Sequence, residues 1–576
     1  MFKKKSKTVL DSKNLPYIIN KQLRLRKHHF ILLFIWIVLG TILRFSNLAA
    51  KPPWADEWAT LVFSLGNSFL TIPLEKIISL DTLIEPLQLR ETISLGNVIN
   101  NLLTESTHPP IYFVLTHLWL KIFSTQDGLV SVYSARSLSA LLGVIGIPAI
   151  FTLSSFVSGS LICGQIAAAL MAFSPYGVYL AQETRHYTLA ILLVIASLAC
   201  LVTAIKYLEK KQLIPFKIIF IWIIINSLGV ATHYFFALAL VTETLVLFDW
   251  LITDIKQQKL VFKAVSSWRR IAIAIFGTIA GCSVWAWAWL NIPDNQLTDW
   301  TKHETFWSNK FLEPVGRIIG WITTMILLLP IEGTPVWVTV LSVIIILFIL
   351  VCLLKFAVQY FKNTSPSLVQ TVIGKYVFFA ILLILGFAYL GDRDLTLAAR
   401  FQFFYFPGII VLVAAILNYS WQQKSKVIFL VLAISFCGSL SVINNYAYQK
   451  PDRVDLVVPI IREAQQKNPD VPILIATVHK THEQTGEMMG IAWEWLKHIE
   501  PEVTPPQFIL LHKKVDEAES NVTDNFRQQL LKLPRPLDIW VVNFSAPTGL
   551  ESQNCVADLE YKRRVSGYRY RLYHCK

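Results

Sequence analysis

Charged residues are scarce in this sequence. Only 16% of the 576 residues are Asp, Glu, Lys or Arg, whereas 54% are apolar and the mean hydropathy is +0.51. Soluble domains contain about 25% charged residues, so the shortage excludes a soluble enzyme, a disordered tail and a fibrous repeat. At about 20 apolar residues per span, roughly 300 apolar residues supply ten or more transmembrane helices. The composition therefore predicts a polytopic membrane protein.

Cysteine is scarce as well, and the sequence has no internal repeat and no low-complexity tract. Five of the seven cysteines lie in long apolar runs, where cysteine is an ordinary small apolar residue. The other two, Cys555 and Cys575, lie near the C-terminus. Two cysteines are too few to define a disulfide framework, so a disulfide and two free thiols both remain open.

Positive charge is concentrated at the N-terminus. Residues 1–29 hold nine Lys or Arg against the single acid Asp11, which is +8 of the net +14. In a membrane protein such a cluster marks the cytoplasmic side, so we expect a basic cytoplasmic N-terminus and no nucleic-acid partner. A cleaved signal peptide is the alternative, but the apolar run 30–43 has no small-residue cleavage site before Arg44.

Long apolar runs predict eleven full spans. They are 30–48, 135–157, 161–180, 188–205, 217–232, 235–250, 271–290, 335–354, 376–390, 403–418 and 427–443. Two shorter stretches, 111–123 and 314–330, predict partial or membrane-surface helices, so the total is about 11–13. Basic segments such as 206–217 and 256–270 are assigned to the cytoplasm. Either odd total places the C-terminus outside.

The character of the sequence changes after residue 443. Residues 444–576 contain 17 basic and 17 acidic residues, and short β-rich runs alternate with helical segments. The β-rich runs are 473–478, 507–512, 538–544 and 569–573, and the helical segments are 455–467, 485–499 and 523–532. About 130 residues can bury their own core. We predict a small C-terminal α/β domain on the outer side, following a transmembrane domain 30–443 that includes the outer loop 49–110.

Two adjacent carboxylates, Asp56 and Glu57, lie between Trp54 and Trp58 directly after the first span. Because tryptophan favours the membrane interface, both acids are expected at the outer headgroup level. A carboxylate at that position can act as a general base towards a substrate hydroxyl. The alternative is an acidic pair that stabilises the start of a helix through the helix dipole.

Further polar residues lie at predicted outer helix ends. They are His108, Arg185, His186, Tyr187, His233, Tyr234 and Arg400. Each has a structural alternative, such as a salt bridge from Arg185 to Glu183 or Asp56. Together they place acids, arginines and histidines on one membrane face, which favours a site at the outer surface. A transporter or flippase needs polar residues at mid-membrane, and the predicted spans have few.

These residues, in this order, resemble the GT-C superfamily of membrane glycosyltransferases, in particular the branch of protein O-mannosyltransferases and aminoarabinose transferases (glycosyltransferase family 39). The resemblance covers roughly residues 30–420. It rests on five short motifs, which are Asp56-Glu57, His108-Pro109-Pro110, Ala135-Arg136-Ser137, Ser174-Pro175 and Glu183-x-Arg185-x-Tyr187.

The resemblance implies a GT-C fold and transfer of a sugar, with inversion, from a polyprenyl-phosphate carrier to a hydroxyl of protein, lipid or glycan. It implies that Asp56 is the general base and that Glu57 orients the acceptor or shares this work. For the donor phosphate the implied partners are Arg185, His186, Arg400 and His108, with Arg136 ranked below them. For the sugar or acceptor they are Tyr187, His233 and Tyr234. Inversion also implies about one sugar width between Asp56 and the phosphate-binding groups.

The sequence departs from the family at His108, where aminoarabinose-type enzymes carry a lysine. The loop 291–313, which includes Trp300, is expected to cover the site or to contact the acceptor. No metal-ligand cluster is present beyond Asp56-Glu57, so we expect no essential metal. The competing hypotheses are a transporter or flippase of lipid-linked sugars and a non-catalytic subunit of a cell-envelope glycan complex. The expected location is the bacterial plasma membrane.

Overall fold

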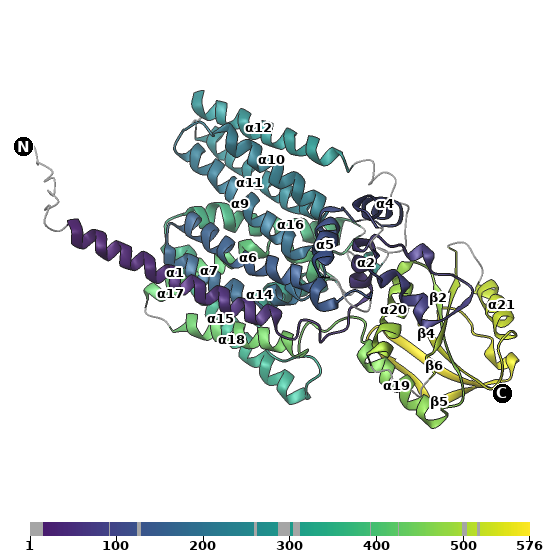
Figure 1. Cartoon of the computed structure of the whole chain (residues 1–576). Helices are drawn as coiled ribbons and strands as arrows, with labels where there is room; N and C mark the ends of the chain where they lie inside the picture. The colour runs from purple at the N-terminus through teal and green to yellow at the C-terminus, as the bar shows by residue number, and fades with distance from the viewer. Residues whose placement is uncertain are drawn as a thin grey trace, which may run out of the picture.

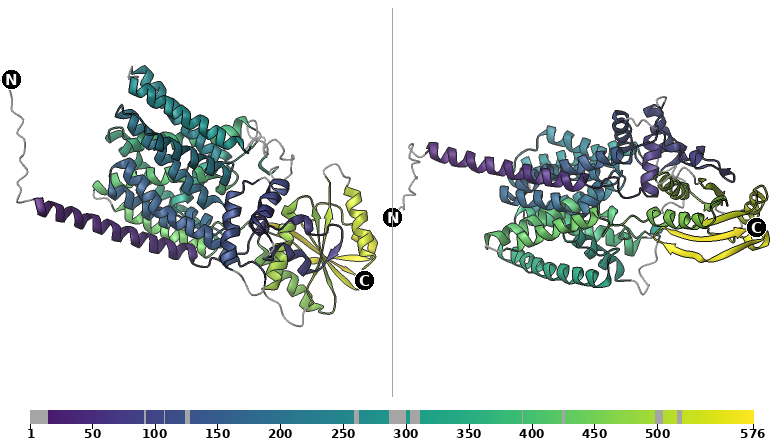
Figure 2. Two further views of the ribbon diagram at one scale, coloured as in Figure 1. Left: turned by 45° about the horizontal axis from the view of Figure 1, so that its top comes forward. Right: turned by 60° about the horizontal axis from the view of Figure 1, so that its bottom comes forward.

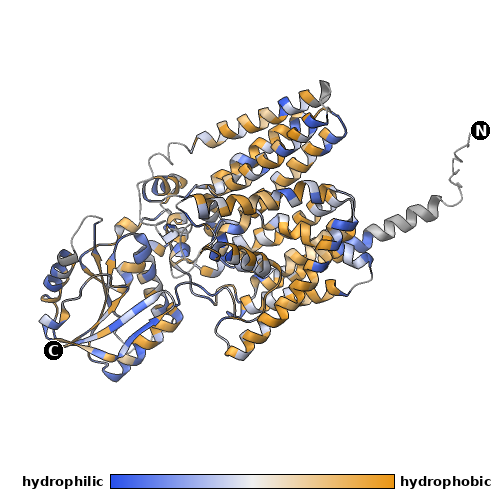
Figure 3. Ribbon diagram, turned by 180° about the vertical axis from the view of Figure 1, so that it is seen from behind, coloured by the Kyte–Doolittle hydropathy of each residue, from blue (hydrophilic) through white to orange (hydrophobic). Residues whose placement is uncertain are grey.

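The computed structural model describes residues 15–90, 93–106, 108–123, 128–257, 262–285, 300–302, 311–391, 393–423, 426–497, 504–514 and 519–576. A helical bundle forms one end of the molecule and an α/β domain forms the other (Figure 1). The long N-terminal helix α1 projects beyond the bundle on the side away from the α/β domain (Figure 2). The bundle is apolar along most of its length, whereas the α/β domain mixes polar and apolar residues (Figure 3).

Every predicted full span corresponds to a helical element. These elements are α1 (Leu15–Phe45), α6 (Val132–Ser158), α7 (Leu161–Phe173) with α8 (Pro175–Ala181), α9 (Tyr187–Glu209), α10 (Phe216–Thr232), α11 (Phe236–Lys256), α12 (Phe262–Ser283), α15 (Val336–Asn363), α16 (Lys375–Leu390), α17 (Phe406–Gln422) and α18 (Val427–Ile443). Among the described residues, six helices are long and apolar enough to cross a membrane, and a seventh span results if α7 and α8 count as one. Helices α10, α17 and α18 are apolar but have only 17 residues each.

The two shorter stretches form short helices, as predicted. Helix α5 (Ile111–Ile122) has 12 residues and α14 (Glu313–Ile326) has 14. At 1.5 Å per residue they are about 18 and 21 Å long, less than the roughly 30 Å of a bilayer core. The structure therefore confirms a polytopic helical protein with a C-terminal α/β domain.

One predicted span is broken within its length. Helices α7 and α8 meet at Ser174 with a bend of 54°, because Pro175 cannot continue the hydrogen-bond pattern. The freed carbonyl groups find partners on other helices. Arg44 of α1 donates to the carbonyl oxygens of Met171 and Ala172 at 2.8 and 3.0 Å, which is the kind of compensation that a break within a membrane needs.

The C-terminal domain is an α/β sandwich. Its helices are α19 (Val454–Lys467), α20 (His482–Leu496) and α21 (Glu519–Leu530), and its strands are β2 (Ile473–His479), β3 (Gln507–His512), β4 (Leu537–Val542), β5 (Cys555–Val565) and β6 (Tyr568–Cys575). Strand β2 runs parallel to β3 and β4, and β6 is antiparallel to β4 and β5. Four strands and three helices match the prediction, whereas β5 was not predicted. Cys555 and Cys575 face each other on β5 and β6 and form a disulfide.

The outer loop joins this domain structurally. It contains α2 (Ala55–Ser64), β1 (Ile77–Ile78), α3 (Leu80–Ile84) and α4 (Leu95–Glu105). Strand β1 pairs with β3 at the edge of the sheet, which has the order β1-β3-β2-β4-β6-β5. Buried residues of α2, including Trp58 and Phe63, share one hydrophobic core with Met489 of α20. The outer loop, which the sequence groups with the transmembrane domain, therefore packs as a layer between the bundle and the C-terminal domain (Figure 1).

Candidate active site

A cavity of about 1060 Å³ lies where the outer loop, the helix ends and the C-terminal domain meet. Seven of the nine predicted site residues line it, namely Asp56, His108, Arg185, Tyr187, His233, Tyr234 and Arg400. The other two, Glu57 and His186, lie behind the wall. Residues up to 344 positions apart in the sequence thus meet in one cavity, which makes it the best candidate for an active site.

Asp56 lies in the first turn of α2 and its side chain is 36% exposed. Its Oδ2 atom lies 3.3 Å from Nη2 of Arg185 and 3.8 Å from Nη2 of Arg400. Burial alone would raise the pKa of Asp56, but the positive charges of Arg185 and Arg400 outweigh it and hold the pKa below its usual value. Asp56 is therefore an ionised carboxylate at neutral pH.

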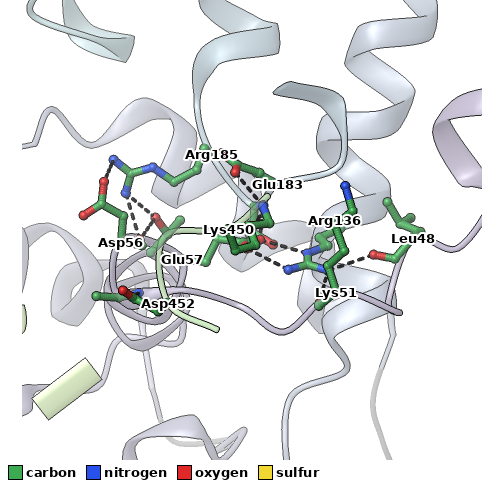
Figure 4. Close-up of polar contacts among 12 residues, drawn as sticks. Leu48, Lys51, Asp56, Glu57, Arg136, Glu183, Arg185, Lys450 and Asp452 are labelled. Atoms are coloured by element: carbon green, nitrogen blue, oxygen red, sulfur yellow. Dashed lines mark hydrogen bonds and ion pairs between the residues drawn. The ribbon is translucent and has the colours of Figure 1, made fainter. Parts of the chain in front are cut away.

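Arg185 is fixed to α2 by several contacts. Its Nη1 donates to the backbone oxygen of Asp56 at 2.8 Å and to the hydroxyl of Thr60 at 2.9 Å. The guanidinium group is only 3% exposed and points towards the Asp56 carboxylate (Figure 4). All of these contacts are made with α2, the helix that carries Asp56. Arg185 is therefore anchored to the same helix as the carboxylate.

Arg400 is held differently. It lies on the short helix η5 (Ala399–Phe404), and its guanidinium carbon lies 4.7 Å from the ring of Trp54 and 5.4 Å from the ring of Trp300. Its side chain is 18% exposed, and among the described residues its ion-pair partner is Asp56 at 3.8 Å. Stacking between aromatic rings leaves the edge of a guanidinium group available for hydrogen bonds to a ligand.

The prediction of a sugar-width gap between Asp56 and its cations is wrong in this structure. Asp56 lies in direct contact range of both Arg185 and Arg400. The physical reason is electrostatic, because two arginines in a partly buried cavity need a counter-charge and Asp56 is the nearest one.

Three histidines surround the arginines. The rings of His186 and His233 lie 4.2 Å apart, and those of His108 and His186 lie 5.7 Å apart. Burial lowers the pKa of His108 to about 3, and the neighbouring Arg185 adds to this shift. Burial also holds the pKa of His233 well below its usual value. These imidazoles are neutral at pH 7 and can offer hydrogen bonds to a phosphate, but no positive charge.

Glu57 belongs to a buried ionic network behind the cavity wall (Figure 4). Its two carboxylate oxygens accept hydrogen bonds from Nε and Nη2 of Arg136 at 2.9 and 2.7 Å, and Oε1 also accepts the backbone N–H of Thr184 at 2.8 Å. Lys450 lies 3.4 Å from Glu57 and 2.5 Å from Glu183. These contacts tie α2 to α6 and to the segment that carries Arg185, so they position the site.

The C-terminal domain contributes a wall that the sequence did not reveal. Lys450, Asp452, His482 and Glu483 all line the cavity. Asp452 accepts the backbone N–H of Ala55 at 2.9 Å, and a Cβ atom at Gly486 of α20 would lie 3.3 Å from the backbone of Ala55. The domain therefore touches the helix that carries Asp56. The sequence signal was weak, since these residues lie among many other charges.

Several other cavity residues were also missed. They are aromatic or polar residues of the bundle side, namely Trp54, Tyr179, Trp321, Glu332, Arg393 and Tyr448. Trp300, expected to contact the site, lines the cavity, whereas most of the loop 291–313 lies outside the described residues. Within the described ranges no group of three or more His, Cys, Asp or Glu could hold a metal ion, and metal independence stays a prediction.

No protein-family model and no curated protein matches this chain. Among solved structures, ArnT from Cupriavidus metallidurans bound to undecaprenyl phosphate is similar at 12% identity and a TM-score of 0.48, covering 95% of this chain and 97% of that one. The apo oligosaccharyltransferase of Archaeoglobus fulgidus is similar at 11% identity and a TM-score of 0.43, covering 92% and 73%. The archaeal oligosaccharyltransferase AglB from Archaeoglobus fulgidus, in complex with an inhibitory peptide and a dolichol-phosphate, is similar at 12% identity and a TM-score of 0.41, covering 95% of this chain and 74% of that one.

Proposed function

We propose that this protein is a GT-C-type glycosyltransferase that moves a sugar from a polyprenyl-phosphate donor to a hydroxyl group at the outer face of the membrane. One observation carries the proposal. An ionised carboxylate, Asp56, faces two arginines, Arg185 and Arg400, in a single large cavity at the ends of apolar helices. A base for the acceptor and cations for a lipid-linked phosphate are the two groups that this transfer requires.

The proposed step is an inverting displacement. Asp56 accepts the proton of the acceptor hydroxyl, whose oxygen attacks the anomeric carbon of the sugar. The bond from that carbon to the phosphate oxygen breaks, and the polyprenyl phosphate leaves with the electron pair. The arginines offset the negative charge that gathers on the leaving phosphate.

The contacts favour different roles for the two arginines. Arg185 is fixed to α2 through Asp56 and Thr60, whereas Arg400 is stacked between rings and meets Asp56 only at 3.8 Å. We assign the donor phosphate mainly to Arg400 and the control of Asp56 to Arg185. A phosphate bound at Arg400 would draw this cation away from Asp56, which raises the basicity of the carboxylate when the donor is present.

The remaining predicted residues receive supporting roles. His108, Tyr187, His233 and Tyr234 line the cavity and can hydrogen-bond the phosphate or the sugar. Glu57 and His186 do not line it, so we propose that Glu57 positions α2 and that His186 packs behind the histidine cluster.

Two features support a location of the cavity on the outer face of the membrane. The N-terminal 29 residues carry +8, which favours the cytoplasm for that end. The C-terminal domain contains the Cys555–Cys575 disulfide, a bond that persists in an oxidising compartment. We place the cavity on the same side as this domain, in a bacterial plasma membrane.

Transport is the competing function, and one observation favours it. Glu243, in the middle of α11, is buried, and its Oε2 atom lies 2.9 Å from the hydroxyl of Ser197. Glu243 does not line the cavity, and its neighbours Asn226 and Trp222 also contact Ser197. A hydrogen-bond network between helices stabilises helix packing.

The test is a comparison of membrane glycans in the native host carrying the wild-type chain, Asp56→Asn or Asp81→Asn. Asp81 is exposed on α3 and serves as the matched control. We expect one glycan modification to disappear with Asp56→Asn, at normal protein levels, and to persist with Asp81→Asn. Unchanged glycans with Asp56→Asn would remove Asp56 as the base, and lipid-linked sugar crossing vesicles without transfer would favour transport.

A further inference from the structure

Two carboxylates of the C-terminal domain line the cavity. Asp452, which follows the bundle, and Glu483, in the first turn of α20, both line the cavity that also contains Asp56 and the two arginines. Within the part of the chain that the structure describes, neither carboxylate has a lysine or arginine ion-pair partner. The cavity thus holds the cations Arg185 and Arg400 together with two carboxylates of the C-terminal domain that have no ion pair of their own among the described residues.

Both carboxylates lie close to the proposed base. Asp452 accepts the N–H of Ala55, the residue that precedes Asp56. Glu483 is exposed to the cavity, and its pKa rises to about 7 because of burial and the nearby charges of Asp56 and Asp452. Burial likewise raises the pKa of Asp452 to about 6. Carboxylates that lack an ion-pair partner gain from a cation that binds between them.

A second observation points to a ligand in the same place. Trp54 lines the cavity beside Arg400, and the residue is only 6% exposed. Its indole Nε1–H has no hydrogen-bond acceptor within the described residues. A buried donor without a partner costs free energy that a ligand oxygen recovers.

From this arrangement we propose that the acceptor carries an ammonium group beside its reacting hydroxyl, and that Asp452 and Glu483 bind this ammonium group while Trp54 donates to an acceptor oxygen. The inference rests on the proposed function and specifies the acceptor's chemistry. Carboxylates form short, charge-assisted hydrogen bonds with ammonium groups. An anionic acceptor would meet two carboxylates in addition to Asp56, which opposes its binding through like-charge repulsion.

Three matched pyranosides test the proposal on the purified full-length protein. They are methyl glucoside, its analogue with an ammonium group in place of the primary hydroxyl, and its uronate. Equilibrium binding at pH 7.5 should favour the ammonium compound over the uronate by about ten-fold. Glu483→Gln should reduce this ratio, and Glu483→Lys should invert it. Glu551→Gln, an exposed residue of the same domain, is the control and should leave the ratio unchanged.

Binding of undecaprenyl phosphate to the same preparations distinguishes a failure of the proposed function from a failure of the acceptor inference. Wild type and Glu483→Gln should bind it equally, which also shows that the variant is folded. A wild-type protein that does not bind undecaprenyl phosphate contradicts the proposed function. A protein that binds it but shows no charge preference among the pyranosides, or binds none of them at about 10 mM, overturns the acceptor inference alone.

Discussion

Asp452 accepts a hydrogen bond from the backbone N–H of Ala55 at 2.9 Å, across 397 residues of sequence. Ala55 is the first residue of α2, where backbone N–H groups have no partner within the helix. The C-terminal domain therefore caps the helix that carries Asp56, so the position of the proposed base depends on both halves of the chain.

This cap predicts different results for two substitutions. Asp452→Asn keeps a side-chain oxygen that can accept the Ala55 N–H, whereas Asp452→Ala removes it. Loss of a helix cap costs about 1 kcal/mol, so we expect Asp452→Ala to lower the melting temperature and turnover with a neutral acceptor more than Asp452→Asn does. Thermal melting in detergent and initial rates measure both effects. Equal losses for the two variants would mean that charge, not capping, explains the role of Asp452.

The two arginines should differ in kinetics. Arg400→Ala removes the less constrained cation, so we expect a rise of about ten-fold or more in KM for the polyprenyl-phosphate donor. Arg185→Ala should lower kcat more than it changes the donor KM, because Arg185 acts on Asp56 through a 3.3 Å contact. Initial rates at varied donor concentration separate the two. A larger donor KM effect for Arg185→Ala would reverse the assignment.

Arg185→Ala should also move the pH profile. The positive charge of Arg185 opposes the effect of burial and helps to hold the pKa of Asp56 below its usual value. Without it that pKa rises, so Asp56 becomes protonated at a higher pH and the acidic limb of the rate profile shifts upward. The measurement is kcat/KM against pH for the wild type and the variant. An unshifted acidic limb would show that Asp56 does not set it.

The Glu57 network should dominate local stability. Removing one partner of a buried ion pair costs about 3–5 kcal/mol, because the other charge stays buried. Glu57 and Arg136 are both 1% exposed, so Glu57→Gln should lower the melting temperature strongly. The exposed pair Glu85–Arg90 is the control, since surface pairs contribute about 0–1 kcal/mol. Similar melting temperatures for Glu57→Gln and Glu85→Gln would contradict the positioning role.

The bundle side of the site could be predicted because charge is rare there. In an apolar background Asp56, Arg185 and Arg400 stand out, and all three line the cavity. Lys450 and Glu483 could not be singled out, because residues 444–576 contain 34 charged residues of balanced sign. Only tertiary contacts place them: the packing of α20 on α2 places Glu483, and ion pairs with Glu57 and Glu183 place Lys450.

The fold likewise has features that the sequence predicts and features that depend on tertiary contacts. Apolar runs predicted the span positions, but the bend at Ser174 depends on partners such as Arg44, which lies on another helix. Strand β1 has two residues and exists through its pairing with β3, which no local pattern encodes. Strand β5 was missed because its run of charged residues lacks the alternation of a half-buried strand.

The disulfide between Cys555 and Cys575 predicts how many cysteines can be alkylated before and after reduction. Cys555 and Cys575 are 20 residues apart, and a loop of that size stabilises a fold by about 3 kcal/mol in the chain-entropy description. Alkylation of the denatured, unreduced protein should label five of the seven cysteines, and all seven after reduction. Cys555→Ser should destabilise β5 and β6, as hydrogen exchange can measure. Seven labelled cysteines without reduction would mean that the domain holds free thiols.

His574 predicts a pH-dependent contact in the same sheet. Its Nδ1 lies 2.7 Å from Asp538 and its Nε2 lies 3.1 Å from Asp558. Burial lowers the pKa of His574, but the hydrogen bonds to both carboxylates outweigh burial and raise the pKa above its usual value. The stabilisation is therefore fully present below the unfolded pKa of about 6.5 and is lost as pH rises through the higher folded value. Hydrogen exchange of β5 and β6, corrected for its intrinsic pH dependence, should show less protection at about pH 8.5 than at about pH 5.5. His574→Gln should remove this difference, and a difference that persists in the variant would assign it to another group.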